Sequence, residues 1–258
     1  MSQITTEQLK QLRDETGVSV MQCKKALEEA GGDMEKAVLL LKKKSSDIAA
    51  KKADREAHDG IVVVKKDAGK VAVLVLNCET DFVASNSDFI ALGDTLVSVA
   101  LSEGKESLES KAKDLIDPVI QKIGENIQLS SVDIIEGAVI GAYIHNNKTA
   151  TIITLSGGDE ALAKDIAMHA TAMKPEFISR NEINADVQEK VKELFKEEVA
   201  ASGKPQDIQE KMLEGKLGTY FKERTLIDQS FVKNPDITVG QLLDQSKAQI
   251  THFFTKSV

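Results

Sequence analysis

Residues 71–84 read VAVLVLNCETDFVA. The first six are all apolar, and an apolar run without polar alternation predicts a strand that is covered on both faces. After this strand come two acids, a hydroxyl and one bulky aromatic, and Ser85-Asn86-Ser87 then begins the next predicted helix. The strand therefore brings Asp81 and Phe82 to a surface turn, where side chains commonly serve recognition or chemistry.

Phe82 has two interpretations. The chain has eight phenylalanines, two tyrosines and no tryptophan, so an aromatic at a turn calls for an explanation. Its ring either packs back into the core of its own domain or lies outward for contact with another molecule. The sequence leaves both interpretations open.

Length and composition indicate a globular chain with one large domain or two to four small ones. Hydrophobic residues make up 41% and charged residues 29% of the 258 residues. No run approaches the roughly 18 apolar residues of a membrane helix, and the N-terminus has neither a signal-peptide block nor a transit pattern. Cys23 and Cys78 lie far apart without metal-type spacing, which favours a reduced, cytoplasmic chain without membrane contact.

The net charge of −8 argues against direct binding of nucleic acid, which requires a basic surface. Residues 42–55 nevertheless contain six basic and only two acidic residues. They are interpreted as a solvated, basic helical linker, and binding of phosphates or acids is the alternative.

Three short helices are predicted within residues 4–44. Thr5 with Gln8 and Ser19 with Gln22 match the capping box, in which a hydroxyl and an amide satisfy free helix donors reciprocally. Turns are expected at Gly17 and Gly31-Gly32, a helix cap at Asp33, and a linker over 45–57. The apolar positions of this small core are Leu9, Leu12, Val20, Met21, Ala26, Leu27, Met34, Ala37, Val38 and Leu41.

The middle of the chain looks duplicated, because each half has strand, hairpin, strand and helix. Two α+β subdomains of similar plan are the simplest interpretation. A further helix between them is expected to end at Gly124. The predicted strands are 60–66, 71–77, 137–145 and 149–155, and the predicted helices are 87–101 and 159–174.

Residues 184–226 predict an antiparallel helical hairpin that is broken at 202–205 by Ser-Gly-Lys-Pro. Its apolar stripe is wide for two helices that project alone, so self-association is expected. A last helix from Thr238 and a closing strand at 250–254 follow. The stripe residues are Val187, Val191, Leu194, Phe195, Val199, Ile208, Met212, Leu213, Leu217, Tyr220 and Phe221.

Motifs of catalysis are missing from the sequence. There is no phosphate-binding loop, no dinucleotide turn and no histidine pair with metal-ligand spacing. Cys78 with a distant histidine is a weak candidate nucleophile, because Glu79 and Asp81 would raise its pKa. Asp81 and Asp88 are a weak candidate for a cation site. The sequence predicts no catalytic residue, metal or cofactor, and it favours a binding protein.

Seven short sequence motifs resemble, in the same order, those of the bacterial elongation factor Ts family, whose members exchange the nucleotide of elongation factor Tu. The resemblance covers nearly the whole chain. It implies a ubiquitin-associated-like three-helix module with a basic linker (1–56), core subdomains at 57–135 and at 136–182 with 227–258, and a dimerisation-type hairpin (183–226). The motifs are residues 12–17, 23–27, 77–84, 122–126, 166–169, 174–177 and 238–243.

The resemblance also implies a mechanism without covalent chemistry. The chain would bind elongation factor Tu, both GDP-bound and nucleotide-free, and lower the barrier to GDP release. Thr80, Asp81, Phe82 and Val83 match the turn that enters beside the magnesium site of the partner. Phe82 would wedge between partner side chains, and Asp81 would disturb the groups that hold the ion.

Further partner contacts are implied for two groups of residues. Arg13, Val20 and Met21 match the module's contact with a partner helix. Members of the family often have methionine at the position of Val20, so the smaller valine should make a somewhat smaller contact. The core contacts are Ile123, Gly124, Asn126 and His145, although His145 could equally be an ordinary residue of a hairpin end. Leu9 and Leu27 are assigned to folding.

The resemblance leaves open whether the hairpin forms a homodimer. Many members of the family also continue past the closing strand with a further helix, whose contacts are not expected of residues 1–258. Two other functions compete with exchange. An adaptor would bind helical ligands through residues 4–44 alone, and a hydrolase would depend on Cys78.

Overall fold

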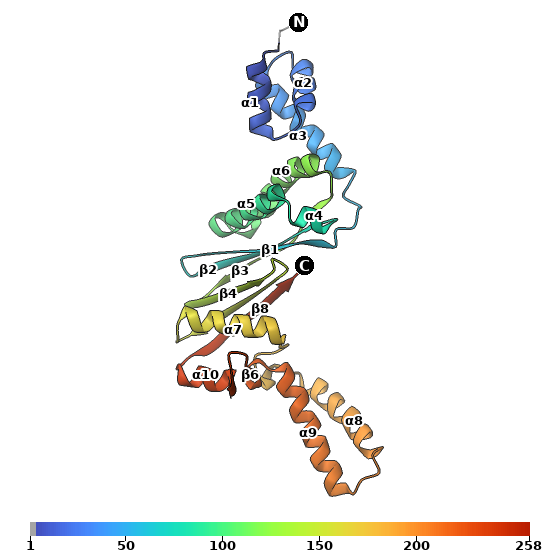
Figure 1. The fold of residues 1–258 in the computed structure, drawn as a ribbon, viewed down its shortest axis with the longest axis vertical. Coiled ribbons are helices and arrows are strands. Elements are labelled where there is room, and N and C mark those ends of the chain that lie inside the picture. The colour runs from blue at the N-terminus through green and yellow to red at the C-terminus, as the bar shows by residue number, and fades with distance from the viewer. Residues whose placement is uncertain (1–3) are drawn as a thin grey trace. The chain divides into compact units, whose positions relative to one another are not determined.

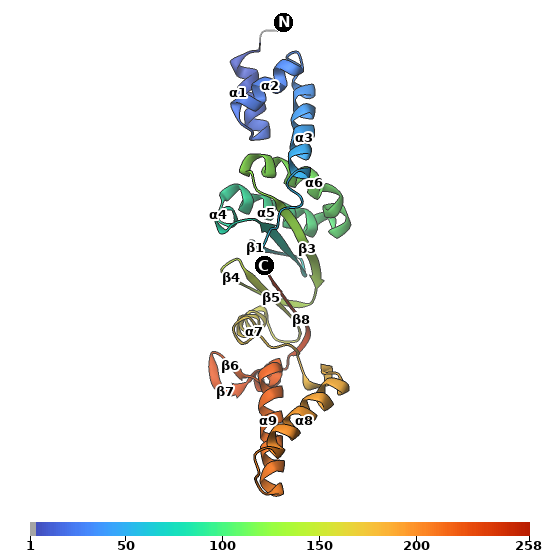
Figure 2. The same cartoon turned by 90° about the vertical axis from the view of Figure 1, so that its right-hand side faces the viewer.

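A computed structural model describes residues 4–258 of the chain (Figure 1 and Figure 2). Residues 1–3, which begin the predicted module 1–56, lie outside the described residues. Helices and strands are mixed, and the predicted α+β fold class is confirmed. The first of two units comprises the described residues up to Ile135 with Asn146–Ala150 and Lys256–Val258, and the second comprises Glu136–His145 and Thr151–Thr255.

Three helices at the N-terminal end, blue in Figure 1, enclose a small core of their own: α1 (Thr6–Thr16), α2 (Val20–Glu29) and α3 (Met34–Ala50). Both predicted capping boxes are present, at Thr5 and at Ser19. Gly17 ends α1 with φ 67°, a left-handed conformation that glycine adopts without strain. Local sequence signals therefore set both ends of α1 and the start of α2.

α3 continues into the predicted helical linker. The linker was expected to be solvated, which is wrong over its first part, because Ser45 and Ala49 are buried. These residues share one face of α3, since they are four positions apart, and their small side chains allow α3 to pack closely on α6 (Lys105–Ile123). The Ser46 hydroxyl donates a hydrogen bond of 2.6 Å to Asp117 on α6.

A three-stranded sheet of order β1-β2-β3 supports the rest of the first unit: β1 (Asp59–Asp67), β2 (Lys70–Cys78) and β3 (Ile127–Glu136). β2 lies in the middle and is buried from Val71 to Leu76, as predicted. β1 is antiparallel to it, with Ile61 opposite Leu76. β3 was not predicted, because Ser130, Ser131 and Asp133 interrupt the alternation of apolar residues.

Helices cover this sheet. α4 (Asp81–Ala84) directly follows β2, and α5 (Ser87–Glu103) packs on β1 and β2. At Gly93 an added Cβ would lie 2.9 Å from Val63 Cγ2, so the glycine allows α5 to approach β1 closely. α6 then packs against α5 and α3.

The second sheet has the order β4-β5-β8: β4 (Val139–His145), β5 (Thr149–Ser156) and β8 (Gln249–Ser257). Its middle strand β5 is buried from Ala150 to Leu155, like β2 in the first sheet. α7 (Glu160–Met173) packs on β4. The short strands β6 (Ser230–Phe231) and β7 (Asn234–Thr238), before α10 (Val239–Gln245), were also not predicted.

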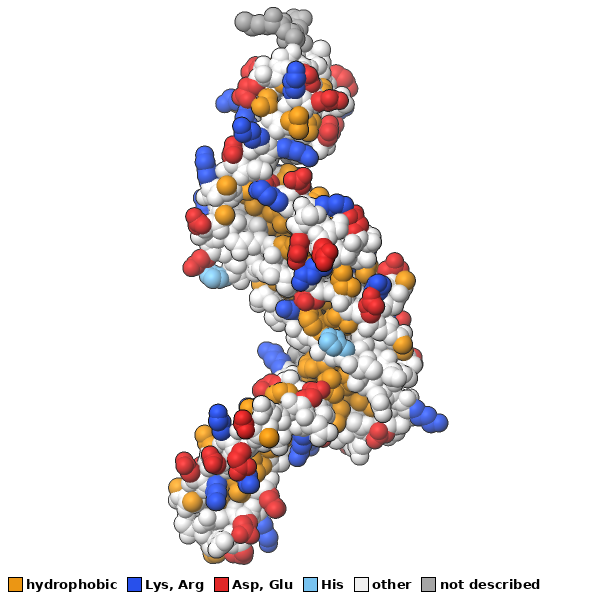
Figure 3. Space-filling view, turned by 180° about the vertical axis from the view of Figure 1, so that it is seen from behind, with side chains coloured by type: hydrophobic (Ala, Val, Ile, Leu, Met, Phe, Trp, Pro, Cys, Tyr) orange, Lys and Arg blue, Asp and Glu red, His pale blue; other side chains and the backbone are white. Residues whose placement is uncertain are grey.

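The predicted hairpin is formed by α8 (Ala185–Ala200) and α9 (Gln206–Arg224), with the 3₁₀ turns η1 (Arg180–Glu182) and η2 (Leu226–Asp228) beside it in sequence. Phe195 packs edge-on against Tyr220, and the Arg224 guanidinium lies 3.8 Å from the centre of the Tyr220 ring. Figure 3 shows acidic and basic side chains mixed along this hairpin, with hydrophobic atoms between them. Among the described residues, no helix combines the length and the apolar character needed to cross a bilayer.

Candidate protein-interaction site

The candidate site is centred on Thr80–Val83, called the 80–83 turn below. Thr80 is the N-cap of the one-turn helix α4, and its hydroxyl oxygen accepts a hydrogen bond of 3.4 Å from the Val83 N–H. Val83 and Ala84 lie inward and are buried, whereas Asp81 is exposed. The Phe82 side chain is 85% exposed, so packing of this ring into its own core is excluded in this structure.

Glu125, just after α6, holds the base of this turn from across the sequence. One of its carboxylate oxygens accepts hydrogen bonds from the Glu79 and Thr80 N–H groups at 3.1 and 3.0 Å. The other oxygen accepts the Thr80 hydroxyl at 2.7 Å. Sequence reasoning missed Glu125, because no local pattern shows which donors a carboxylate will meet 45 residues away.

A second carboxylate makes the reciprocal bond. Glu79 accepts the Asn126 N–H at 2.7 Å, and Arg55 lies 3.4 Å from the same Glu79 oxygen. Asn126 is only 2% exposed, and its side-chain amide donates to the Arg55 carbonyl at 2.6 Å. Asn126 therefore connects the turn to the segment after α3, and its predicted contact with a partner stays a prediction.

The other predicted residues of this region lie at the end of α6. Gly124 has φ 91° and ends the helix, while its carbonyl accepts a hydrogen bond from Lys52. Gly124 is exposed and Ile123 is half-buried against the core of the first unit. The structure thus brings the 80–83 turn together with the end of α6.

The module residues lie elsewhere. Val20 and Met21, in the first turn of α2, are 51% and 69% exposed, and Arg13 is exposed in the last turn of α1. Figure 3 shows hydrophobic side chains among charged ones on the visible face of the three-helix module. His145 belongs to the second unit, where it is exposed at the end of β4, with its Nδ1 3.4 Å from the Tyr143 hydroxyl.

Cys78 ends β2 in the interior. It is fully buried, and its thiol donates to the Thr80 carbonyl at 3.2 Å. Burial, together with the nearby charges of Asp59 and Glu125, raises the pKa of Cys78 to about 11. The expected direction was right, but the expected neighbours, Glu79 and Asp81, are not the cause. A buried thiol of this pKa stays protonated and is a poor nucleophile.

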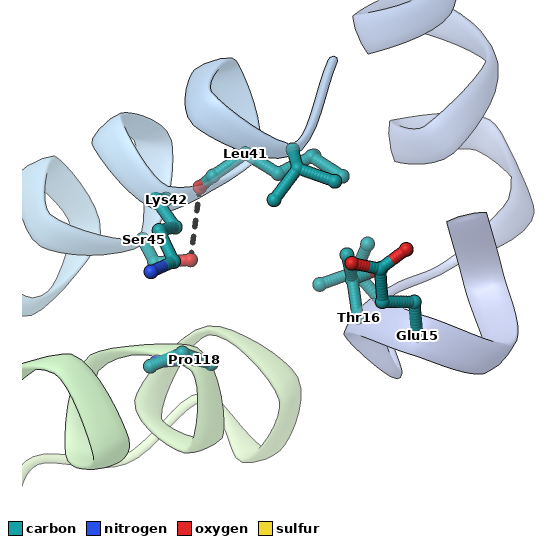
Figure 4. Close-up of a pocket in the computed structure, with 8 residues that line it drawn as sticks. Glu15, Thr16, Leu41, Lys42, Ser45 and Pro118 are labelled. Carbon is teal, nitrogen blue, oxygen red and sulfur yellow. Dashed lines mark hydrogen bonds between the residues drawn. The ribbon is translucent and has the colours of Figure 1, made fainter. Parts of the chain in front are cut away.

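In the described residues the potential metal ligands are not clustered, and the pocket beside the three-helix module is small. Within residues 4–258, no group of three or more His, Cys, Asp and Glu side chains is placed to hold a metal ion. A pocket of about 180 Å³ lies between α1, α3 and α6 (Figure 4). It is lined by Leu41, Ser45 and Pro118 among others, and the Ser45 hydroxyl is already bonded to the Leu41 carbonyl. Ligand pockets commonly have about 300–1,000 Å³, so this one is small.

Comparisons with known proteins place the chain in a family. The family model described as elongation factor TS matches residues 79–258, which include the turn, Glu125 and the second unit. The chain belongs to the elongation factor Ts family. The module lies outside the matched range, but full-length relatives include it. Elongation factor Ts of Hahella chejuensis is 41% identical over 97% of this chain and 90% of its own length.

Two further members of the elongation factor Ts family show similar coverage. The protein of Chlorobium phaeobacteroides is 40% identical over 99% of this chain and 94% of its own length. That of Saccharophagus degradans is 42% identical over 97% of this chain and 89% of its own length. Membership confirms the resemblance and identifies the chain as a translation elongation factor.

Proposed function

We propose that this chain binds elongation factor Tu and accelerates the release of GDP from it, so that GTP can bind. Family membership supports the partner. The observation that carries the site is Phe82, an aromatic side chain that is 85% exposed at a turn held by a buried strand. A large exposed ring on a rigid base is typical of residues that dominate protein interfaces.

In the proposed mechanism, Phe82 enters between side chains of the partner and Asp81 approaches the groups that hold its magnesium ion. Binding energy from these contacts stabilises the nucleotide-free form of the partner. Because linkage is reciprocal, tighter binding of this chain means weaker binding of GDP, and binding of GTP then releases the chain. No bond to this chain is made or broken, and we expect the reaction to take place in the cytoplasm.

The module and the end of α6 supply the remaining contacts of the proposal. Val20 and Met21 form an exposed apolar pair in the first turn of α2, suited to the side of a partner helix, and Arg13 is exposed in the last turn of α1. Ile123, Gly124 and His145 are proposed as core contacts, and Asn126 acts with them from the interior.

We also propose that the hairpin, residues 183–226, carries a homodimer contact. Leu194, Val187 and Ile208 are 62%, 45% and 40% exposed and remain uncovered by their own hairpin. Sedimentation over rising protein concentration should show a dimer that Leu194→Glu disrupts. A wild-type chain that stays monomeric at all concentrations would rule this contact out.

Release of fluorescent GDP from elongation factor Tu tests the main proposal. One molecule of this chain per ten of the partner should release nearly all of the nucleotide, because an exchange factor turns over. Cys78→Ala should retain this activity, apart from the small cost of a buried cavity. Failure of the wild-type chain to speed release would refute exchange, and loss of all activity in a folded Cys78→Ala variant would favour thiol chemistry.

A further inference from the structure

Glu125 belongs to none of the predicted contacts, yet it is a main partner of the 80–83 turn. Its carboxylate accepts three hydrogen bonds from Glu79 and Thr80, between 2.7 and 3.1 Å. Hydrogen bonds to an ionised carboxylate are shorter and about twice as strong as neutral ones. Three of them on two adjacent residues fix both the backbone and the side chain at the start of the turn.

The turn needs such support because α4 has only four residues. A single helical turn fixes several backbone dihedrals for few hydrogen bonds, so it is not stable alone in water. Its own N-cap bond, from the Val83 N–H to Thr80, is long at 3.4 Å. Burial of Val83 and Ala84 holds the inner face, but it does not fix the direction of the exposed Asp81 and Phe82.

Glu79 completes the support from the other side. Its carboxylate accepts the Asn126 N–H at 2.7 Å, directly after Glu125 in the chain. Residues 79–80 and 125–126 therefore exchange hydrogen bonds in both directions. Asn126 and Arg55 also link this pair to the segment that follows α3.

We infer that Glu125 is a positioning residue for the exchange reaction, which holds the 80–83 turn in its binding geometry before the partner arrives. The inference rests on the proposed function. A turn that is already ordered does not lose conformational entropy on binding, so a smaller share of the binding energy is spent on ordering it. If only a tenth of the molecules had an ordered turn, the apparent dissociation constant would rise about tenfold.

Amide hydrogen exchange of the full-length free chain tests the ordering without any partner. Glu125→Ala removes both oxygens that accept the three hydrogen bonds, whereas Glu125→Gln keeps the shape but offers one neutral acceptor oxygen in place of two charged ones. The amides of residues 79–86 should exchange faster in the order Ala, Gln, wild type. Glu106→Ala, which removes an exposed carboxylate in the first turn of α6, is the matched control and should leave these amides unchanged.

GDP release tests the positioning role. Glu125→Ala should raise the concentration for half-maximal release about tenfold and Glu125→Gln about threefold. The maximal rate should stay near that of the wild type, because Asp81 and Phe82 are intact. Val132→Ala, at a buried position of β3, controls for lost stability and should not change half-saturation.

The two measurements separate the possible failures. Unchanged amide hydrogen exchange of residues 79–86 in a folded Glu125→Gln chain overturns the inference, even if Glu125→Ala fails to fold. Faster amide hydrogen exchange without any change in the concentration for half-maximal GDP release overturns the inference as well. If the wild-type chain does not accelerate GDP release, the proposed function has failed. The amide hydrogen exchange measurement still decides whether Glu125 orders the turn.

Discussion

Phe82 is exposed and not packed into its own fold, which fits its proposed role in binding a partner. Its ring is 85% exposed, while its neighbours Val83 and Ala84 are buried. An exposed aromatic contributes little to the stability of the chain that carries it, but it offers a large contact area with few rotatable bonds. Its loss should therefore affect binding and not folding.

Phe82→Ala should reduce the acceleration of GDP release at least about 30-fold, which corresponds to about 2 kcal/mol for the loss of an interface anchor. The free energy of unfolding should change by less than about 0.5 kcal/mol, as for other exposed positions. Val232→Ala, at another exposed apolar position, is the control. Parallel losses of thermal stability and activity in Phe82→Ala would contradict the wedge.

His169 is the opposite case, a fully buried side chain that serves the fold. Its Nδ1 accepts the Val232 N–H at 3.1 Å, so the ring is neutral and its Nε2–H donates to Gln229 at 2.9 Å. Burial lowers the pKa of His169, and the hydrogen bond to Gln229 opposes part of that shift.

The lowered pKa of His169 predicts a pH dependence of stability. The unfolded chain binds a proton near pH 6.5, whereas the folded chain resists it to a lower pH. Stability is therefore complete above pH 6.5 and is lost as pH falls from there through the folded pKa. Melting temperatures between pH 7.5 and 5 should decline less in His169→Gln than in the wild type. Equal declines would contradict this, and His58→Gln, at an exposed histidine, is the control.

Among the secondary-structure elements, close approach is set by glycine. An added Cβ at Gly141 on β4 would lie 2.1 Å from the carbonyl carbon of Ala163 on α7, which no packing tolerates. At Gly215, inside α9, nothing lies within 4 Å of the same atom. The same substitution should thus have opposite effects in two elements.

Gly141→Ala should destabilise the second unit by at least about 1–3 kcal/mol, because α7 has to move away from β4. Gly215→Ala should stabilise α9 by about 0.5–1 kcal/mol, since alanine restricts the unfolded chain and favours helix. Thermal unfolding followed by circular dichroism measures both. A Gly141→Ala chain with an unchanged melting temperature would show that β4 and α7 are not in this close contact.

At the scale of the complete molecule, we propose that different segments serve partner binding and nucleotide exchange. The module offers an apolar pair, Val20 and Met21, on a short bundle with its own core, and the 80–83 turn offers Asp81 and Phe82. The module should supply affinity, and the turn should supply the disturbance of the partner's nucleotide site.

Met21→Glu therefore should raise the concentration for half-maximal GDP release about tenfold and leave the maximal rate unchanged, because a charge replaces an apolar contact at a site away from the turn. Lys10→Glu, at an exposed position of α1, is the control for charge. A lower maximal rate at saturation in Met21→Glu would assign exchange to the module as well. The adaptor hypothesis differs in predicting that residues 4–44 alone retain the main binding activity.

Much of this could be predicted from the sequence, because it depends on neighbours three or four residues apart. The capping boxes at Thr5 and Ser19 and the break in the hairpin at 202–205 are of this kind. The buried character of β2 followed from its apolar run. Family membership rests on short sequence motifs and did not depend on the tertiary structure.

Contacts between distant residues were decided only in the folded chain. β3 became a strand although its alternation is broken, because β2 offered it an edge. α3 continued through Ser45 and Ala49 because α6 lay against them. The outward direction of Phe82 and the carboxylate of Glu125 beneath it depend on residues 45 positions apart. Hydrogen bonds and burial join groups that are near in space, and spacing along the chain carries no record of that proximity.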